Sequence, residues 1–325
     1  MKRRGQPQRL LFIRTDRLGE TLLNLPAAAA LKAAFPGSRL TFVAHPDVRP
    51  LIASLPWVDH TIAAPQGPRH AWWRRAWRLG RQLRAGRFDV AVVSNPKQEL
   101  HVAVWLAGIA QRLGYDRKWG CLLTHRVPDH KARGTQHEVE SNLELVCRLG
   151  VPIAVPSWHV PALPRERAEV FAMLVARGMS ASQALIVVHP WTSHPVKRWP
   201  MERFCAFIER VRQRLPAAVV IVGNPQAPAV MPAGGSVVDL TNQLSLTQLA
   251  ALLQQAKLLI SSDSGPVHLA AAVGTPTVAL FGTTEPARSP ARWGPWGEGH
   301  TVIWKPSMDE ITVEEVLDAV ERHLG

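Results

Sequence analysis

The sequence predicts an α/β protein built from two doubly wound domains. Apolar runs of strand length alternate with helix-like segments along all 325 residues. Several runs are apolar throughout, which is typical of parallel strands covered by helices on both faces. A proline-rich passage at residues 150–169, GVPIAVPSWHVPALPRERAE, interrupts the series, and the strand pattern restarts after it. We therefore expect one domain over residues 1–160 and a second over residues 161–325.

Nine segments are expected to form strands. They are residues 10–14, 39–44, 60–64 and 88–94 in the first half, and 184–190, 217–223, 236–240, 257–265 and 275–282 in the second. The stretch ETLLNLPAAAALKAAF, residues 20–35, is expected to form the helix after the first strand. Residues 313–324 have the pattern of an amphipathic helix, packed either within the second domain or back on the first.

Bulk composition bounds the class of protein. Hydrophobic residues make up 46% of the chain, as in globular proteins. No apolar run approaches the roughly 18 to 20 residues that cross a bilayer, and the start lacks the apolar segment of a signal peptide. Three scattered cysteines suit a reducing cytoplasm. The net charge of +13 favours a polyanionic partner: nucleic acid, an anionic membrane or a phosphorylated substrate.

The stretch LLFIRTDRLGETLLNLP, residues 10–26, passes from a strand into a helix. Ligands of open α/β sheets bind at the carboxyl ends of strands, so Asp16, Arg17 and Glu20 lie where a site is expected. Gly19 is expected to allow a tight turn. The simpler alternative is that Glu20 only stabilises the helix dipole. The stretch holds no GxGxxG pattern, so a dinucleotide fingerprint is not supported.

Two loops in the second half carry groups suited to a nucleotide diphosphate. In HPWTSHPVKRWPMERF, residues 189–204, hydroxyls could orient a diphosphate and Lys197 could neutralise it, although a solvated basic loop has the same composition. In SDSGPVHLAAAVG, residues 262–274, Asp263 precedes a helix that Pro266 would open, with His268 in its first turn. The alternative makes Asp263 a helix cap and His268 a packing residue.

The segment RHAWWRRAWRLGRQLRAGR, residues 69–87, reads as a cationic helix with a tryptophan stripe. One interpretation is contact with anionic lipid or a phosphorylated acceptor. The other is a surface helix that packs through its tryptophans and leaves its arginines in solvent.

Taken together, these stretches resemble the ADP-heptose:lipopolysaccharide heptosyltransferases, glycosyltransferase family 9. Four stretches carry the resemblance, in the family's order and over nearly the whole chain: IRTDRLGETLLNLPAAAALKAAFP, HEVESNLELVCRLG, KRWPMERF and SDSGPVHLAAAVGTPTVALFGTTEP. The resemblance implies a GT-B-like fold, with two Rossmann-like domains facing across a cleft. The acceptor would bind the N-terminal domain and the nucleotide sugar the C-terminal one. It further implies an inverting, metal-independent transfer of heptose from ADP-heptose to the lipopolysaccharide inner core, and the chain has no Asp-X-Asp motif.

The resemblance also implies roles for individual residues. The general base falls on Glu20, where the family has an aspartate, and the phosphate-binding lysine falls on Lys197. Donor binding falls on Thr192, Ser193, Asp263, Ser264, Gly265, His268, Thr284 and Glu285; the family usually reads Thr-Asp-Pro where this chain has Thr284-Glu285-Pro286. Acceptor binding is assigned, from position and charge, to Asp16, Arg17, Arg117, Lys118 and His137.

The implied substrates are a nucleotide sugar and an anionic lipopolysaccharide precursor carrying Kdo carboxylates and phosphates. We expect no cofactor, no metal and no nucleic-acid partner. The expected location is the cytoplasm, peripherally attached to the inner membrane. Two other functions stay open: the same fold acting on another nucleotide sugar or glycan acceptor, and a polyanion- or membrane-docking protein without catalysis.

Overall fold

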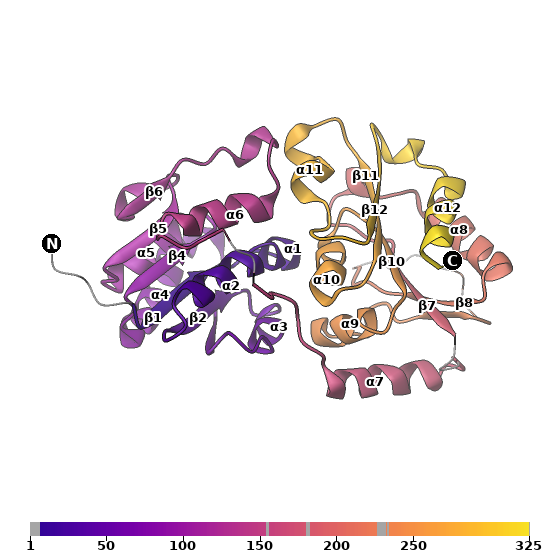
Figure 1. Ribbon diagram of the computed structural model, residues 1–325, viewed down its shortest axis with the longest axis horizontal. Coiled ribbons are helices and arrows are strands. Elements are labelled where there is room, and N and C mark those ends of the chain that lie inside the picture. Colours follow the sequence, from indigo (N-terminus) through magenta and orange to yellow (C-terminus); the bar gives the residue numbers. More distant parts are fainter. Residues whose placement is uncertain (1–6, 154–155, 180–182, 226–231, 233, 325) are drawn as a thin grey trace. The chain divides into compact units, whose positions relative to one another are not determined.

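The computed structural model describes residues 7–153, 156–179, 183–225, 232 and 234–324. The chain divides into two compact units, Met1–Val160 and Pro161–Gly325, and the boundary between them falls within the proline-rich passage of the sequence (Figure 1).

Unit 1 contains a six-stranded sheet in which every neighbouring pair is parallel. The sheet order is β3-β2-β1-β4-β5-β6, so the order reverses between β1 and β4. The strands are β1 (Arg9–Ile13), β2 (Arg39–Ala44), β3 (His60–Ala63), β4 (Val90–Val93), β5 (Gln111–Tyr115) and β6 (His125–Val127). This is the Rossmann order, in which ligands bind at the point of reversal.

The α-helices of unit 1 are α1 (Leu18–Leu22), α2 (Leu25–Ala34), α3 (Arg49–Ala53), α4 (Trp72–Gly86), α5 (Gln98–Leu106) and α6 (Glu138–Cys147), with short 3₁₀ turns η1 (Arg69–Ala71), η2 (Gly120–Leu122) and η3 (Lys131–Arg133). One core cluster joins Leu79 and Leu83 of α4 and Val104 of α5 to Leu11 and Val93 of the central strands. Burial of these side chains fixes α4 and α5 on the sheet.

Unit 2 repeats the same architecture with a second parallel sheet. Its order is β12-β11-β10-β7-β8-β9, which reverses between β7 and β10. The strands are β7 (Ala184–His189), β8 (Ala217–Ile221), β9 (Val237–Asp239), β10 (Leu258–Ser262), β11 (Thr277–Gly282) and β12 (His300–Lys305). The prediction of two doubly wound, Rossmann-like domains is confirmed.

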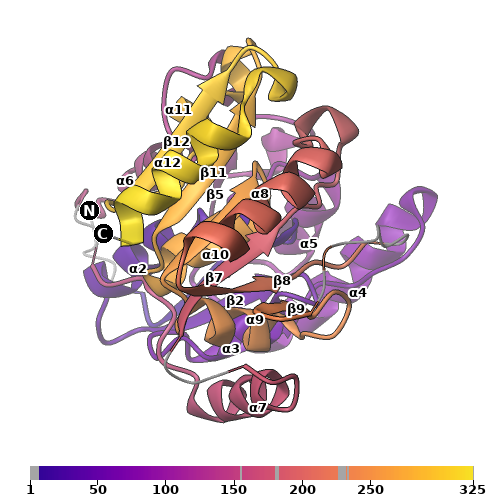
Figure 2. The same ribbon diagram turned by 90° about the vertical axis from the view of Figure 1, so that its right-hand side faces the viewer.

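The α-helices of unit 2 are α7 (Pro164–Val175), α8 (Met201–Arg214), α9 (Leu246–Leu253), α10 (Gly265–Val273), α11 (Pro290–Trp293) and α12 (Val313–Leu324), with 3₁₀ turns η4 (Pro195–Lys197), η5 (Pro286–Arg288) and η6 (Met308–Glu310). The final helix, α12, lies alongside α8 (Figure 2). The buried residues Val316, Leu317 and Val320 of α12 belong to the core of unit 2, so the apolar face of this helix is buried within that unit.

All nine expected strands are present, but β5, β6 and β12 were not expected. Their sequences, QRLGY, HRV and HTVIWK, mix charged and polar residues with apolar ones, and β6 and β12 are edge strands without a fully buried residue. The single helix expected at 20–35 is wrong: α1 ends at Leu22 and α2 starts at Leu25. Pro26 explains the break, because proline has no N–H and its ring clashes with the carbonyl four residues earlier. Across the described residues, none of the helices is both long and apolar enough to cross a membrane.

Candidate functional site

The loops after β1 and β4 of unit 1 lie side by side at the point where the strand order reverses. Ile13 and Val93 pair in register at the ends of these strands. The side-chain amide of Asn95, after β4, donates to Thr15 Oγ1, after β1, at 3.2 Å. The buried Arg14 donates to the Ser94 carbonyl at 3.3 Å. The sheet therefore joins two polar loops into one site.

Asp16 is held by two cations in this site. Its two carboxylate oxygens contact Arg14 Nη2 at 3.2 Å and Lys97 Nζ at 2.6 Å. Burial alone would raise the pKa of Asp16, but Arg14 and Lys97 outweigh it and hold the pKa below its usual value. Asp16 is therefore a carboxylate that stays charged and whose oxygens are already engaged.

Glu20 has different surroundings. It is the third residue of α1 and half-buried. Within the described chain, its carboxylate has no ion-pair or hydrogen-bond partner, while its backbone carbonyl accepts from the Asn24 side-chain amide at 2.7 Å. The expectation that Gly19 provides a tight turn is wrong: Gly19 is a buried residue inside α1, and its φ is not positive. The turn is made by residues 14–17.

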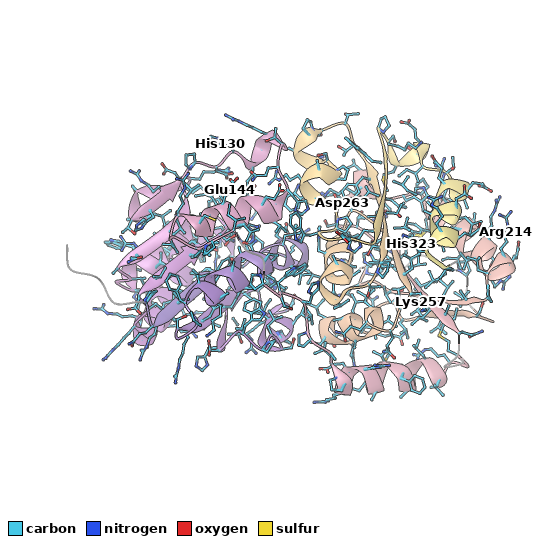
Figure 3. All side chains as sticks on the ribbon, viewed as in Figure 1. His130, Glu144, Arg214, Lys257, Asp263 and His323 are labelled. Atoms are coloured by element: carbon cyan, nitrogen blue, oxygen red, sulfur yellow. The ribbon has the colours of Figure 1, made fainter. Side chains whose placement is uncertain are left out.

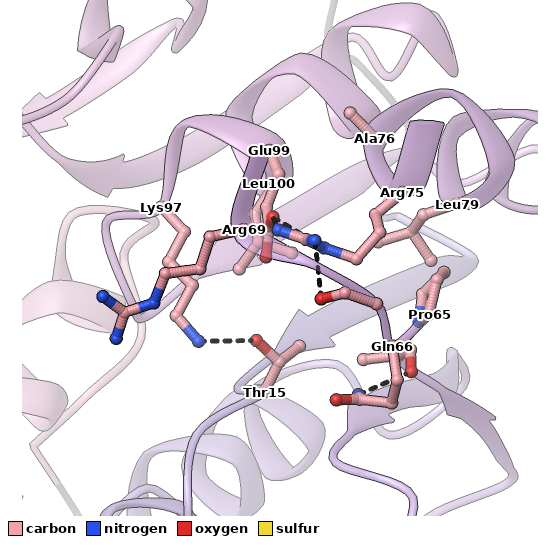
Figure 4. A pocket seen from close by; sticks show the side chains of 12 residues that line it. Thr15, Pro65, Gln66, Arg69, Arg75, Ala76, Leu79, Lys97, Glu99 and Leu100 are labelled. Atoms are coloured by element: carbon pink, nitrogen blue, oxygen red, sulfur yellow. Dashed lines mark hydrogen bonds and ion pairs between the residues drawn. The ribbon is translucent and has the colours of Figure 1, made fainter. Parts of the chain in front are cut away.

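A cavity of about 280 Å³ lies next to these loops (Figure 4). Its polar lining includes Thr15, Gln66, Arg69, Arg75 and Lys97. Arg75 Nε donates to Glu99 at 3.0 Å, whereas the Arg69 guanidinium is exposed and makes no ion pair among the described residues. The sequence analysis did not predict this cavity: Gln66 stands in no motif, and Arg69 was considered only as the first residue of the cationic stretch 69–87.

The remaining predicted acceptor-binding residues lie in different loops and at different helix starts of unit 1. Arg17 is exposed at the start of α1, and Lys118 is exposed after β5. Arg117 donates to Asp129 at 2.9 Å. His137 is buried and caps α6: its Nδ1 accepts from the Val139 amide at 3.2 Å, which gives it a structural task.

A buried lysine that the sequence did not single out joins α6 to this side of unit 1. Lys131 Nζ binds Glu138 and Asn142 of α6 and lies 4.5 Å from the centre of the Tyr115 ring. Burial lowers the pKa of Lys131 to about 8, with Glu138 acting in the opposite direction. Asn142 in turn donates to the Leu23 carbonyl at 3.1 Å, next to α1. The stretch HEVESNLELVCRLG thus joins α6 to η3 and to the segment between α1 and α2.

In unit 2 a buried histidine connects three elements at the reversal point. His189 ends β7 and pairs in register with Ser261 of β10. Its Nδ1 lies 3.1 Å from Ser261 Oγ and 3.3 Å from the hydroxyl of Ser264, which caps α10. Burial lowers the pKa of His189 to about 4, so the ring is neutral at pH 7.

The loop after β7 brings Lys197 to the end of β10. Lys197 Nζ forms an ion pair with Asp263 at 2.5 Å, and Figure 3 labels Asp263 on the ribbon. Burial raises the pKa of Asp263, which the ammonium of Lys197 only partly offsets. Trp199, fully buried, fastens this loop: its indole donates to the Ile311 carbonyl at 2.9 Å. Asp263 is therefore an ion-pair partner and not the helix cap, which is Ser264.

The other predicted donor residues lie on the same sheet edge, because β7, β10 and β11 are neighbours. Thr192 donates to the His194 carbonyl at 2.7 Å, Ser193 is exposed, and His268 is buried in α10. Gly265 opens α10, so Pro266 takes its second position and not the first, as was expected. Thr284 and Glu285 are exposed after β11.

A small cavity at this edge is lined by Lys197, Asp263, Thr283 and Arg288. Of the loop after β11 it includes Thr283, but not Thr284 or Glu285, to which donor binding was assigned. Arg288 was not predicted, and its Nε contacts Glu285 at 3.1 Å. Two cations and a helix N-terminus thus meet at one strand edge, which suits a ligand with phosphate groups.

The comparisons with known proteins agree with this architecture. The family model of glycosyltransferase family 9 (heptosyltransferase) matches residues 76–319. The chain is 25% identical to lipopolysaccharide heptosyltransferase 3 of Escherichia coli, over 94% of this chain and 92% of that protein.

Two solved structures share the fold over almost the full length of both chains. A glycosyltransferase family 9 protein from Veillonella parvula is 22% identical with a TM-score of 0.86, covering 98% of this chain and 97% of that chain. E. coli ADP-heptose lps heptosyltransferase II is 22% identical with a TM-score of 0.80, covering 98% of each. The family match spans most of the sequence and includes the loops of the unit 2 site. This chain therefore belongs to glycosyltransferase family 9, the heptosyltransferase family.

Proposed function

We propose that this protein is an inverting glycosyltransferase that moves heptose from ADP-heptose to the lipopolysaccharide inner core. The observation that carries the proposal is the strand edge of unit 2, where Lys197 and Arg288, each paired with a carboxylate, line one small cavity, and α10 begins two residues after Asp263 of the same lining. The names of the relatives support the choice of heptose and lipopolysaccharide, and membership of family 9 supports glycosyl transfer.

The donor would bind unit 2 through its diphosphate. Lys197 and Arg288 supply positive charge, and the amides at the start of α10 add the positive end of a helix dipole. A phosphate oxygen would compete with Asp263 for the Lys197 ammonium. The Thr192 and Ser193 hydroxyls and Gly265 stand at the same sheet edge for further contacts. Charge on departing ADP is then stabilised by groups already in position.

Glu20 would act as the general base. It accepts the proton of the acceptor hydroxyl as that oxygen bonds to the anomeric carbon. The bond from the anomeric carbon to the phosphate oxygen breaks on the opposite face, and its electron pair leaves with ADP. One displacement inverts the anomeric configuration. The open carboxylate of Glu20, beside an Asp16 that two cations hold, supports this assignment.

The cavity of unit 1 is a candidate for the acceptor's acidic groups. Arg69 and the ammonium of Lys97 line it, and a carboxylate or phosphate would offset their charge. An acceptor of this kind is anchored in a membrane, so we place the enzyme in the cytoplasm at the inner-membrane surface. We further propose that no divalent cation takes part; activity should then be the same with and without EDTA.

The direct test is release of ADP from ADP-heptose in the presence of a soluble Kdo-bearing acceptor. Wild type should release ADP only with both substrates present. Glu20→Ala should lower kcat about 10²- to 10⁴-fold, the usual contribution of a general base. Equal release by wild type and Glu20→Ala would remove Glu20 from that role.

A second candidate uses the same site for another nucleotide sugar or another glycan acceptor. The glutamates at positions 20 and 285, where the family resemblance leads one to expect aspartates, favour keeping it. A thermal-shift panel decides: stabilisation by UDP but not by ADP would exclude ADP-heptose as the donor.

A further inference from the structure

Two of the three tryptophans of α4 face solvent: Trp73 and Trp77 are 54% and 53% exposed, whereas Trp72 is half-buried. The buried face of the helix is Ala76, Leu79, Gly80 and Leu83, so the interpretation that Trp73 and Trp77 pack it on the protein is wrong. A Cβ atom added to Gly80 would lie 3.0 Å from the Leu106 side chain of α5, so the inner face of α4 packs closely against α5.

The outer face of this helix is strongly basic. Residues 69–87 contain seven arginines and no aspartate or glutamate. Arg75 pairs with Glu99, and the other six are exposed. The guanidinium of Arg74 lies 5.0 Å from the Trp73 ring and that of Arg81 lies 4.8 Å from the Trp77 ring. Aromatic and cationic groups are therefore interleaved on one exposed surface.

The indole N–H groups of Trp73 and Trp77 have no acceptor among the described residues. By contrast, the indoles of Trp199, Trp293 and Trp304 each donate to a backbone carbonyl. An exposed indole with a free N–H is suited to the headgroup layer of a bilayer. There the ring contacts apolar acyl chains and the N–H donates to polar headgroup oxygens.

Neighbouring elements add two more half-exposed tryptophans, Trp105 of α5 and Trp119 before η2. Trp119 contacts Trp72, the first residue of α4, edge-on at 5.7 Å. Lys118 and Trp119 both have positive φ, 42° and 66°, which is unfavourable for residues other than glycine. The backbone thus keeps a strained turn that presents a large apolar ring to solvent.

We propose that α4 is the membrane-docking surface of this protein and lies along an anionic bilayer. Trp73 and Trp77 enter the headgroup layer, and Arg74, Arg78 and Arg81 bind lipid phosphates. The inference gives a surface to the membrane association that the proposed function requires. The positive charge of α4 favours a bilayer of acidic lipids as the partner. The exposed indoles, which have no acceptor on the protein, favour a lipid interface over a soluble polyanion.

Co-sedimentation with vesicles tests the surface. The full-length protein should bind vesicles of phosphatidylcholine with phosphatidylglycerol, and binding should weaken with salt and with pure phosphatidylcholine. Changing Arg74, Arg78 and Arg81 together to Gln should weaken binding on the order of a hundredfold, because each basic residue near such a surface adds to the affinity. The double variant Trp73→Ser/Trp77→Ser should weaken it roughly tenfold or more.

Matched controls come from unit 2. Arg167, Arg212 and Arg214, all exposed, changed together to Gln remove the same charge, and Phe171→Ser removes an exposed ring. Both controls should bind vesicles like wild type. Circular dichroism checks that each variant is folded. ADP release with a soluble acceptor should be unchanged in the α4 variants, which separates a failure of this surface from a failure of the proposed function.

Three results would overturn the proposal. One is that wild type does not bind the anionic vesicles. Another is equal weakening by the unit 2 arginine control, which would mean that net charge alone acts. The third is unchanged vesicle binding by the α4 variants together with a loss of soluble-acceptor turnover or of nucleic-acid binding, which would make α4 a polyanion site.

Discussion

At the residue scale, surroundings separate two carboxylates that lie four positions apart. Asp16 contacts Arg14 and Lys97, which lower its pKa and occupy both its oxygens. Glu20 carries a carboxylate that the described protein groups leave open. A base must reach a substrate proton and release it again, so an engaged carboxylate is the poorer candidate. The side chain of Glu20 can therefore approach a substrate without breaking a contact to the protein.

Lys197 should be essential for donor chemistry. Lys197→Ala removes a cation placed in advance at the leaving-group site and should lower kcat about 10²- to 10³-fold. Lys257→Ala is a matched control, because Lys257 is an exposed lysine of unit 2 labelled in Figure 3. Steady-state ADP release measures both. If Lys197→Ala kept most of the wild-type kcat, the leaving-group assignment would be wrong.

The sequence indicated the loops of the site better than the contacts within them. Strand ends are visible as apolar runs, so Lys197 and Asp263 could be placed after strand ends in advance, and Glu20 at the start of the helix that follows the first strand. The pairing of Lys197 with Asp263 joins residues 66 positions apart and depends on the strand order. Lys131 and Arg288 were missed because a single arginine or lysine among polar residues has no local pattern that distinguishes it from solvated charge. Arg69 was noticed only as the first residue of the cationic stretch 69–87, not as part of a cavity.

At the element scale, buried polar contacts hold the loops to the sheets. The Lys131–Glu138 pair fixes α6, and Glu138 is only 2% exposed. Lys131→Met would leave a buried carboxylate without its cation and should lower the free energy of unfolding by about 3–5 kcal/mol. The double variant Lys131→Met/Glu138→Leu should recover much of that loss.

Urea unfolding of the two variants and wild type measures this coupling. Arg126→Gln with Asp116→Asn is the matched control, because both side chains of that ion pair of unit 1 are exposed, 54% and 47%, and should change the free energy of unfolding by less than about 1 kcal/mol. A single variant no less stable than the double variant would contradict the coupling.

His189 should make unit 2 sensitive to acid. Its native pKa of about 4 lies below the usual value of 6.5, so the unfolded chain binds a proton that the native protein does not. The free energy of unfolding must then fall as pH drops from about 6.5 to about 4, by roughly 3 kcal/mol in total. Urea midpoints of wild type and His189→Asn between pH 7.5 and 4 measure it. The variant should lose less stability over this range; parallel curves would refute the role of His189.

Some elements could not be predicted because their stability is not local. Pro26 and Asn24 divide the expected helix into α1 and α2, although the apolar pattern continues through both. The edge strands β6 and β12 depend on pairing with β5 and β11, since their own sequences are too polar or too exposed to signal a strand. The strands at the centre of each sheet, β1 and β4 in unit 1 and β7 and β10 in unit 2, are by contrast apolar on both faces and were predicted. The interior strand β5 was missed because it opens on Gln111 and Arg112.

At the scale of the whole molecule, the chain repeats one topology with two specialisations. Both sheets reverse their order beside their first strand, so each unit has one natural ligand-binding edge. Unit 1 places there an open carboxylate, Glu20, beside an Asp16 that Arg14 and Lys97 hold, and unit 2 places Lys197 and Arg288, whose partners Asp263 and Glu285 a phosphate could replace. A reaction that needs a base for the acceptor and positive charge for departing ADP matches this division.

This difference between the two units predicts that ADP binds at the sheet edge of unit 2 in the full-length protein. Hydrogen exchange with mass spectrometry should show ADP slowing exchange in residues 189–198, 261–268 and 283–288. At a concentration of one hundred times its Kd, ADP should add about 2.7 kcal/mol to the stability of unit 2. The exchange of unit 1 strands should change far less, because their core is separate. Lys197→Ala should abolish most of the protection, whereas Lys257→Ala should not. Protection confined to unit 1 would place the nucleotide on the wrong sheet and exclude the donor site proposed for unit 2.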